Sequence, residues 1–121
     1  MKNDVARSLV RSETGNDDFR AVYRFDPDLQ VFRGHFPNAP MVPGVFQIEM
    51  ARQAAEALVG RALRVREVRK AKFTAVVAPG DVVLLEGRLS RNGTLVAASV
   101  TARVGEAVVG QVTLVLEELP S

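Results

Sequence analysis

Apolar and polar residues alternate with a period of two through much of the second half of the chain, which predicts antiparallel β-strands. Over residues 82–90, Val83, Leu85 and Leu89 share one face. The Asn92-Gly93 pair predicts a hairpin because both turn residues need positive φ, and Gly105-Glu106 suits a second turn. We therefore expect strands over 64–73, 82–90, 95–104 and 107–117, and two N-terminal strands near 5–13 and 18–25.

Residues 44–59 change to a helical period. Pro43 fits the first turn because its φ already suits a helix, and Gly60 is placed to end the helix. The apolar residues that recur at helical spacing are Val45, Ile48, Ala51, Ala55, Leu58 and Val59. The predicted order is ββαββββ, with one long helix facing a largely antiparallel sheet, which is the α+β class.

Composition restricts the chemistry of the chain. Its 121 residues predict a single domain over 1–121, and 47% hydrophobic residues exclude a mainly disordered protein. With no cysteine and one histidine, disulfides, thiolate nucleophiles, Cys-based zinc sites and multi-histidine metal sites within one chain are excluded. We expect no metal and no cofactor, so acid–base chemistry near neutral pH falls to His35 and the carboxylates.

The charge of the chain is small but unevenly distributed. A net charge of +2 does not indicate nucleic-acid binding, and no signal-peptide pattern or bilayer-spanning run is present in the sequence, so a cytoplasmic protein without membrane contact is expected. Residues 61–72 carry a local balance of +5 and are either the solvated face of a strand or a docking patch for an acidic partner. The basic residues of this stretch are Arg61, Arg64, Arg66, Arg69, Lys70 and Lys72.

The segment before the predicted helix presents the histidine on a proline-rich loop. Val42 precedes Pro43 and has no side-chain oxygen, so the first N–H groups, those of Gly44 and Val45, lack the usual capping partner. Such N–H groups at the positive end of a helix can form an oxyanion site, although water can also cap them.

Glu49 interrupts the apolar face about one and a half turns into the predicted helix. Gln53, four residues later, could orient its carboxyl group by a hydrogen bond. Desolvation by apolar neighbours would raise the pKa of Glu49 and let it hold a proton for donation; alternatively it is an ordinary exposed glutamate. Arg52, three residues after Glu49, either pairs with the carboxylate and lowers its pKa or points outward.

Together these residues match a known signature. The pattern G-H-F-P-x-x-P-x-x-P-G-V-x-x-x-E-x-x-x-Q over residues 34–53 resembles the active-site signature of the hot-dog-fold 3-hydroxyacyl acyl-carrier-protein dehydratases of bacterial fatty-acid synthesis. A looser similarity covers residues 70–81. The resemblance implies an antiparallel sheet wrapped around a central helix and dehydration of a 3-hydroxyacyl thioester to a trans-2-enoyl thioester, in fatty-acid or related lipid, polyketide or polyene synthesis.

The same resemblance implies residue roles. His35 would remove the α-hydrogen, Glu49 would protonate the departing hydroxyl, and the N–H of Gly44 would polarise the thioester carbonyl. Val45, Gln53 and Phe36 complete the expected substrate-binding set. The implied substrate carrier is an acyl carrier protein, and the implied assembly is a homodimer, possibly a trimer of dimers, with His35 and Glu49 of each site coming from different subunits.

Two other functions remain compatible with the sequence. One is a non-catalytic hot-dog subunit that binds acyl chains and pairs with an active partner. The other is a hot-dog thioesterase, which would release a free carboxylic acid instead of an enoyl thioester.

Overall fold

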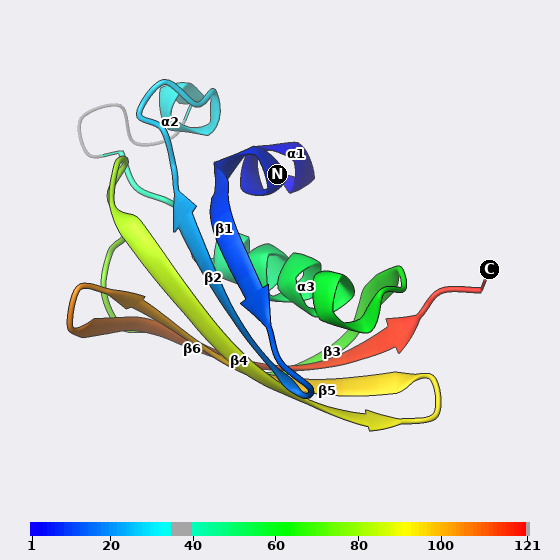
Figure 1. Ribbon diagram of the computed structural model, residues 1–121. Helices are drawn as coiled ribbons and strands as arrows, with labels where there is room; N and C mark the ends of the chain where they lie inside the picture. The colour runs from blue at the N-terminus through cyan, green and yellow to red at the C-terminus, as the bar shows by residue number, and fades with distance from the viewer. Residues whose placement is uncertain (35–39, 121) are drawn as a thin grey trace.

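A six-stranded antiparallel sheet curves around one long helix (Figure 1). The computed structural model describes residues 1–34 and 40–120. The strands lie in the order β1-β2-β4-β5-β6-β3, so β1 and β3 form the two edges. The elements in chain order are α1 (Lys2–Ser8), β1 (Leu9–Thr14), β2 (Asp18–Arg24), α2 (Val31–Gly34), α3 (Val45–Val59), β3 (Leu63–Phe73), β4 (Val82–Asn92), β5 (Leu95–Val104) and β6 (Ala107–Glu118).

The alternating pattern predicted the central strands correctly. Val83, Leu85 and Leu89 are all at most 5% exposed and face α3. The β5–β6 hairpin turns at Gly105 with φ 59°, as expected. The β4–β5 hairpin is shifted by one residue: Asn92 pairs with Leu95, so the two-residue loop is Gly93-Thr94 rather than Asn92-Gly93. Gly93 has φ 64°, and Asn92 continues the strand.

The N-terminal prediction was partly wrong. Residues expected to begin a strand near position 5 instead form α1, and β1 starts only at Leu9. Val5 and Ser8, spaced three apart, are buried on α1, and Val5 is fully buried in the hydrophobic core. The Ser8 hydroxyl donates to the Asp4 carbonyl at 2.7 Å, which closes the last turn of the helix. The short helix α2 was not predicted.

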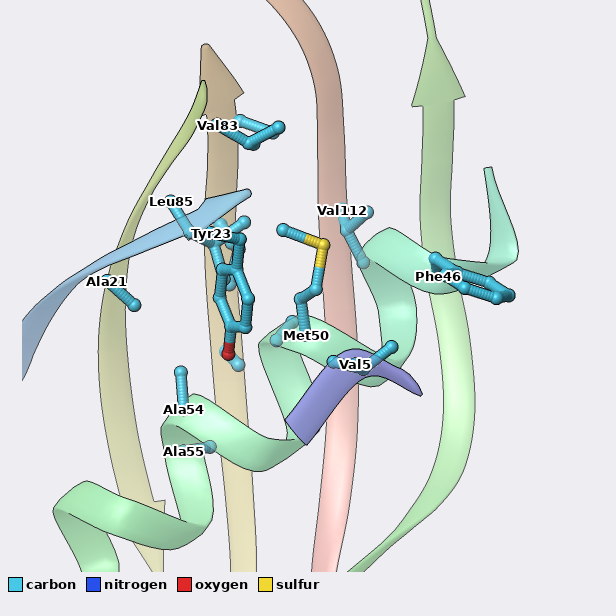
Figure 2. Close-up of a cluster of buried hydrophobic side chains, with 14 of the residues drawn as sticks. Val5, Ala21, Tyr23, Phe46, Met50, Ala54, Ala55, Val83, Leu85 and Val112 are labelled. Atoms are coloured by element: carbon cyan, nitrogen blue, oxygen red, sulfur yellow. The ribbon is translucent and has the colours of Figure 1, made fainter. Parts of the chain in front are cut away.

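The buried face of α3 is rotated from the predicted one. Phe46, Met50 and Ala54, four residues apart, are buried together with Ala51 and Ala55 (Figure 2). Val45 was predicted to face the core but is 48% exposed. Large side chains therefore fill the start of the helix interface, and alanines at its second half allow the sheet to approach closely.

Aromatic and aliphatic side chains from the sheet meet this face. Tyr23 stacks on Phe25 with ring centroids 6.3 Å apart, and the ring centroids of Phe25 and Phe46 are 5.8 Å apart. Figure 2 shows Met50 between Tyr23 and Val112, which come from strands at different positions in the sheet. Within residues 1–34 and 40–120, no helix is long and apolar enough to cross a membrane.

Met50→Ala tests this core. Met50 is 1% exposed, so truncation removes buried methylene groups and leaves a cavity; we expect the free energy of unfolding to fall by about 2–5 kcal/mol. Val10→Ala, at a side chain that is 60% exposed, is the control and should change it by less than about 0.5 kcal/mol. Chemical denaturation measures both, and equal effects would contradict the assigned packing.

Candidate active site

His35 and Phe36 lie outside the described residues, so their predicted roles stay predictions. The chain on either side is fixed to the core. Phe32 on α2 is 7% exposed, and the Val42 N–H donates to the Val77 carbonyl at 2.8 Å.

The N-terminus of α3 has the uncapped form expected from the sequence. Gly44 is the N-cap residue, and in the part of the chain that the structure describes no side chain accepts a hydrogen bond there. The N–H groups of Phe46 and Gln47 are satisfied by the carbonyls of Pro43 and Gly44, at 3.0 and 2.9 Å. The N–H groups of Gly44 and Val45 come earlier in the turn and are the ones that could bind a developing oxyanion.

Gly44 is required by a close contact rather than by its backbone angles. Its φ of −56° is helical, which any residue adopts. A Cβ at this position would lie 2.5 Å from the Phe73 ring, so a side chain would force that ring to move. The Phe73 ring at the end of β3 thus lies directly against the helix N-terminus.

A cavity of about 310 Å³ opens beside this contact. Gln47 lines it, although the residue is only 3% exposed, and its Oε1 has no hydrogen-bond partner among residues 1–34 and 40–120. Sequence reasoning missed Gln47; the available signal was an amide in an otherwise apolar turn, between Phe46 and Ile48. The cavity is lined by Met41, Val42, Gly44, Gln47, Phe73, Thr74, Ala75 and Val76.

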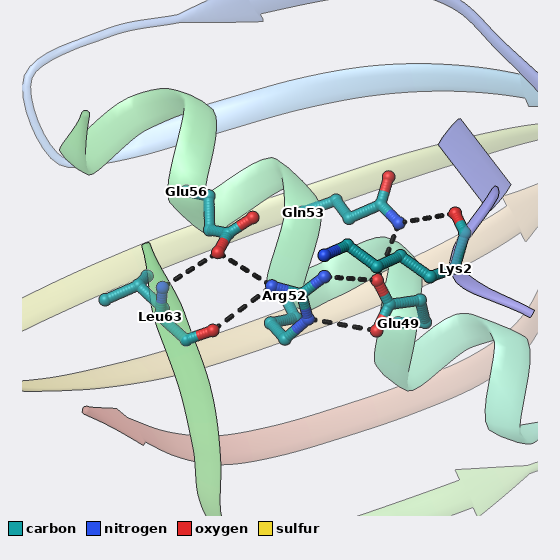
Figure 3. A network of polar contacts seen from close by, with 6 residues as sticks. All are labelled: Lys2, Glu49, Arg52, Gln53, Glu56 and Leu63. Carbon is teal, nitrogen blue, oxygen red and sulfur yellow. Dashed lines mark hydrogen bonds and ion pairs between the residues drawn. The ribbon is translucent and has the colours of Figure 1, made fainter. Parts of the chain in front are cut away.

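Glu49 lies on the face of α3 opposite the one packed on the sheet, and its side chain is 11% exposed. Arg52 makes two hydrogen bonds to the Glu49 carboxylate: Nε donates to Oε1 at 2.9 Å and Nη2 donates to Oε2 at 2.5 Å (Figure 3). Gln53 Nε2 donates to Oε2 at 2.6 Å, so the orienting role predicted for Gln53 has a geometric basis. Of the two orientations open to Arg52, the structure has the paired one.

The expected rise in the pKa of Glu49 was wrong. Burial does raise it, but hydrogen bonds from Arg52 and Gln53, with the charges of Arg52 and Lys2, outweigh burial and hold the pKa of Glu49 below its ordinary 4.5. The lower pKa agrees with the other possibility open from the sequence, in which Arg52 pairs with the Glu49 carboxylate. Glu49 is therefore a carboxylate near neutral pH in this arrangement.

Arg52 also bonds beyond Glu49. Its Nη1 lies 2.7 Å from Glu56 Oε2 and donates to the Leu63 carbonyl at 3.1 Å. Glu56 Oε2 in turn accepts the Leu63 N–H at 2.8 Å. One guanidinium thus joins two carboxylates of α3 and ties the helix to the first residue of β3.

The N-terminal helix closes the other side of this network. Gln53 Nε2 donates to the Lys2 carbonyl at 3.0 Å as well as to Glu49 (Figure 3), and the charge of the Lys2 side chain favours the Glu49 carboxylate. On the sheet side, burial and then the charge of Glu49 raise the pKa of Tyr23 to about 12. Tyr23 is therefore neutral across the physiological range.

The basic stretch over 61–72 is largely paired with acidic side chains. Arg64 and Arg66 both bind Glu117 of β6, and Arg61 lies 3.6 Å from Glu118. Arg69 pairs with Glu67 at 3.0 Å, and Lys70 donates to Gln111. Its arginines remain more than half exposed, but these carboxylates offset much of the +5 balance read from the sequence. Among residues 1–34 and 40–120, no cluster of potential ligands could hold a metal ion.

Comparison with known proteins identifies relatives of the chain. A family model described as "ApeI-like: ApeI dehydratase" matches residues 11–110. The 3-hydroxyacyl-acyl-carrier-protein dehydratase FabZ of Chlamydia pneumoniae is 43% identical over 68 residues, covering 49% of this chain and 44% of that protein. FabZ of Levilactobacillus brevis is 37% identical over 87 residues, covering 65% and 59% respectively. The chain spans about half the length of the curated relatives it matches.

Solved structures share the fold. The dehydratase heterocomplex ApeI:P from Xenorhabdus doucetiae superposes with a TM-score of 0.79 at 24% identity, covering 91% of this chain and 96% of that one. A hypothetical thioesterase with coenzyme A from Streptococcus pneumoniae TIGR4 gives 0.72 at 11% identity, covering 98% and 94%. These likenesses, with the antiparallel sheet around α3, confirm the α+β hot-dog fold.

Glu49→Gln tests the electrostatics of the site through stability. A carboxylate whose pKa is lower when folded stabilises the protein above its unfolded pKa near 4.5, and this contribution is lost as the pH falls through the folded value. We therefore expect Glu49→Gln to reduce the loss of unfolding free energy on acidification below about pH 5. Denaturation series at several pH values measure it. Glu106→Gln, in an exposed turn, should keep the wild-type slope, and an unchanged slope in Glu49→Gln would contradict the assigned pKa direction.

Proposed function

Because the chain belongs to the ApeI-like dehydratase family, we propose that it dehydrates 3-hydroxyacyl thioesters to trans-2-enoyl thioesters. The observation that carries the proposal is the placement of Glu49. A desolvated carboxylate, oriented by Gln53, lies five residues after the uncapped N-terminus of α3 at Gly44. The helix thus offers an acid–base group and an oxyanion site at the spacing of the dehydratase signature.

The reaction divides among three groups. The N–H of Gly44, with that of Val45, polarises the thioester carbonyl and makes the α-hydrogen acidic. His35 takes the α-proton, the electron pair forms the new C2–C3 double bond, and the C3–O bond breaks. Glu49 gives its proton to the departing hydroxyl, which leaves as water. Charge on His35 and Glu49 is restored when a proton passes from one to the other through solvent.

The cavity beside Gly44 suits the acyl thioester. Its lining is mainly apolar, with the side chains of Gln47 and Thr74 as polar exceptions, and it reaches the helix N-terminus where the carbonyl would bind. We assign the carrier to an acyl carrier protein, approaching the exposed arginines of β3, and the reaction to cytoplasmic synthesis of fatty acids or related products. The side chains of Arg64 and Arg69 are 63% and 62% exposed, which supports contact with an acidic carrier protein.

We further infer that the active unit is a homodimer with two shared sites, one possible building block of a trimer of dimers. β3 is an edge strand, and large apolar side chains are exposed on it and near the start of α3. A second copy would cover them, since unpaired edges and exposed apolar patches favour association. These side chains are Val45, Val68, Phe73 and Val76, which are 42% to 61% exposed.

The turnover test uses the purified full chain with a 3-hydroxyacyl thioester on acyl carrier protein, and follows enoyl absorbance. We expect His35→Ala and Glu49→Ala each to reduce kcat/KM by about 10²–10⁴-fold, as for loss of a general base or acid. Glu106→Gln is the control and should retain activity. An equal rate of enoyl formation in the wild type and in the double variant His35→Ala, Glu49→Ala would contradict the proposal.

Mixing the two inactive variants tests the shared site. In a dimer formed from one His35→Ala chain and one Glu49→Ala chain, one site has lost both groups and the other keeps both. Random re-association should therefore restore about a quarter of the wild-type activity. No recovery after verified subunit exchange would show that His35 and Glu49 act within one chain.

The same assay decides between the alternatives. A non-catalytic subunit would bind acyl carrier protein without turnover and become active only with a partner; the pairing of Glu49 with Arg52 is the feature that favours it. A thioesterase would release free carboxylic acid, which mass spectrometry detects. Presenting the same acyl group on coenzyme A tests the assigned carrier.

A further inference from the structure

Glu49 must carry a proton to act as the acid of the proposed reaction, yet its surroundings are built for the carboxylate. Both oxygens accept from Arg52, and Oε2 also accepts from Gln53. With a side chain only 11% exposed, water replaces these donors poorly. Hydrogen bonds from charged donors strongly favour the ionised form of a buried carboxylate.

Arg52 has a second partner within reach. Glu49 precedes it by three residues and Glu56 follows it by four, so both carboxylates lie on the same face of α3 as the guanidinium. Nη1 already contacts Glu56 at 2.7 Å, and its bond to the Leu63 carbonyl holds it on that side. The Glu56 side chain is 27% exposed against 11% for Glu49, so water solvates Glu56 more readily in either state.

We propose that Arg52 is a positioning residue that holds Glu49 as a carboxylate between turnovers and turns to Glu56 when Glu49 takes up a proton. The inference rests on the proposed dehydratase function. On protonation, a proton from solvent adds to a Glu49 oxygen and the ion pair to Arg52 is lost. Glu56 keeps the guanidinium paired, so no charge of α3 is left buried alone.

The other groups around Glu49 also affect its protonation. Lys2 of α1 adds a positive charge that favours the carboxylate, and Gln53 donates without titrating. Tyr23 of β2 stays neutral because its pKa is raised to about 12. Removing Arg52 and removing Glu56 should therefore shift the pKa of Glu49 in opposite directions, and Lys2 is unchanged in both variants.

The test compares pH profiles of kcat/KM for Arg52→Met and Glu56→Gln. Activity needs a protonated Glu49, and the pKa of Glu49 sets one limb of the profile, so removing the guanidinium should move this limb upward by about 1–3 pH units. Glu56→Gln keeps an acceptor for the Leu63 N–H but makes Glu49 the one carboxylate paired with Arg52. The guanidinium then favours the ionised form of Glu49 more strongly, so the limb should move to lower pH. Arg52→Lys, which keeps the charge without the two-bond grip, should lie between the wild type and Arg52→Met.

Structural damage would have a different signature. If Arg52 only stabilised the fold, both variants would lose activity at every pH without opposite shifts of the limb. Arg88→Met, at an exposed arginine of β4, controls for the loss of a positive charge and should leave the profile unchanged. A folded, active Arg52→Met variant with the wild-type limb would overturn the inference while leaving the dehydratase proposal intact.

A direct titration separates the two proposals. Carboxyl ¹³C NMR reports the protonation of Glu49 whether or not the protein turns over substrate. We expect Glu49 to titrate about 1–3 pH units higher in Arg52→Met than in the wild type. Equal titration in the two proteins would overturn the inference, whereas absence of turnover with shifted titration would overturn only the dehydratase function.

Discussion

The packing of one face of α3 into the curved sheet is the constraint on which the rest of the structure depends. Phe46, Met50 and Ala54 are buried against side chains of the sheet, and that contact fixes the rotation of the helix about its axis. The rotation decides the position of every other side chain on α3. It places Glu49, Arg52 and Glu56 together on the opposite face, where they can interact only with one another and with neighbouring segments.

The electrostatics of the candidate site follow from that shared face. Burial disfavours a charged Glu49, but a guanidinium and an amide at hydrogen-bond distance favour it more strongly, so the pKa is lowered. A carboxylate in this state is well oriented but not yet an acid. The dehydration that we propose requires Arg52 to release Glu49, and Glu56, already 2.7 Å from the guanidinium, is the partner that we propose for it in that state.

Much of the fold could be predicted because it depends on local periodicity. Alternation placed Val83, Leu85 and Leu89 in the core, and the helical period identified the helix from 45 to 59. The failures occurred where local pattern was ambiguous. Val5 and Ser8, three residues apart, share one face of a helix but would lie on opposite faces of a strand, and Val5 packs into the core from the helix α1.

The sequence by itself determined the fold class, the uncapped helix start at Gly44 and the spacing of Glu49 and Gln53, since these depend on residues close together in the chain. Only the tertiary structure decided whether Arg52 would pair with Glu49, because the guanidinium is also held by the Leu63 carbonyl on β3, and Lys2 on α1 adds its charge to the surroundings of Glu49. The protonation of a buried carboxylate depends on the balance of desolvation and nearby donors. The donors to Glu49, Arg52 and Gln53, are its near neighbours in sequence. The orientation of their side chains depends on contacts with the Leu63 carbonyl and the Lys2 carbonyl, which belong to distant segments.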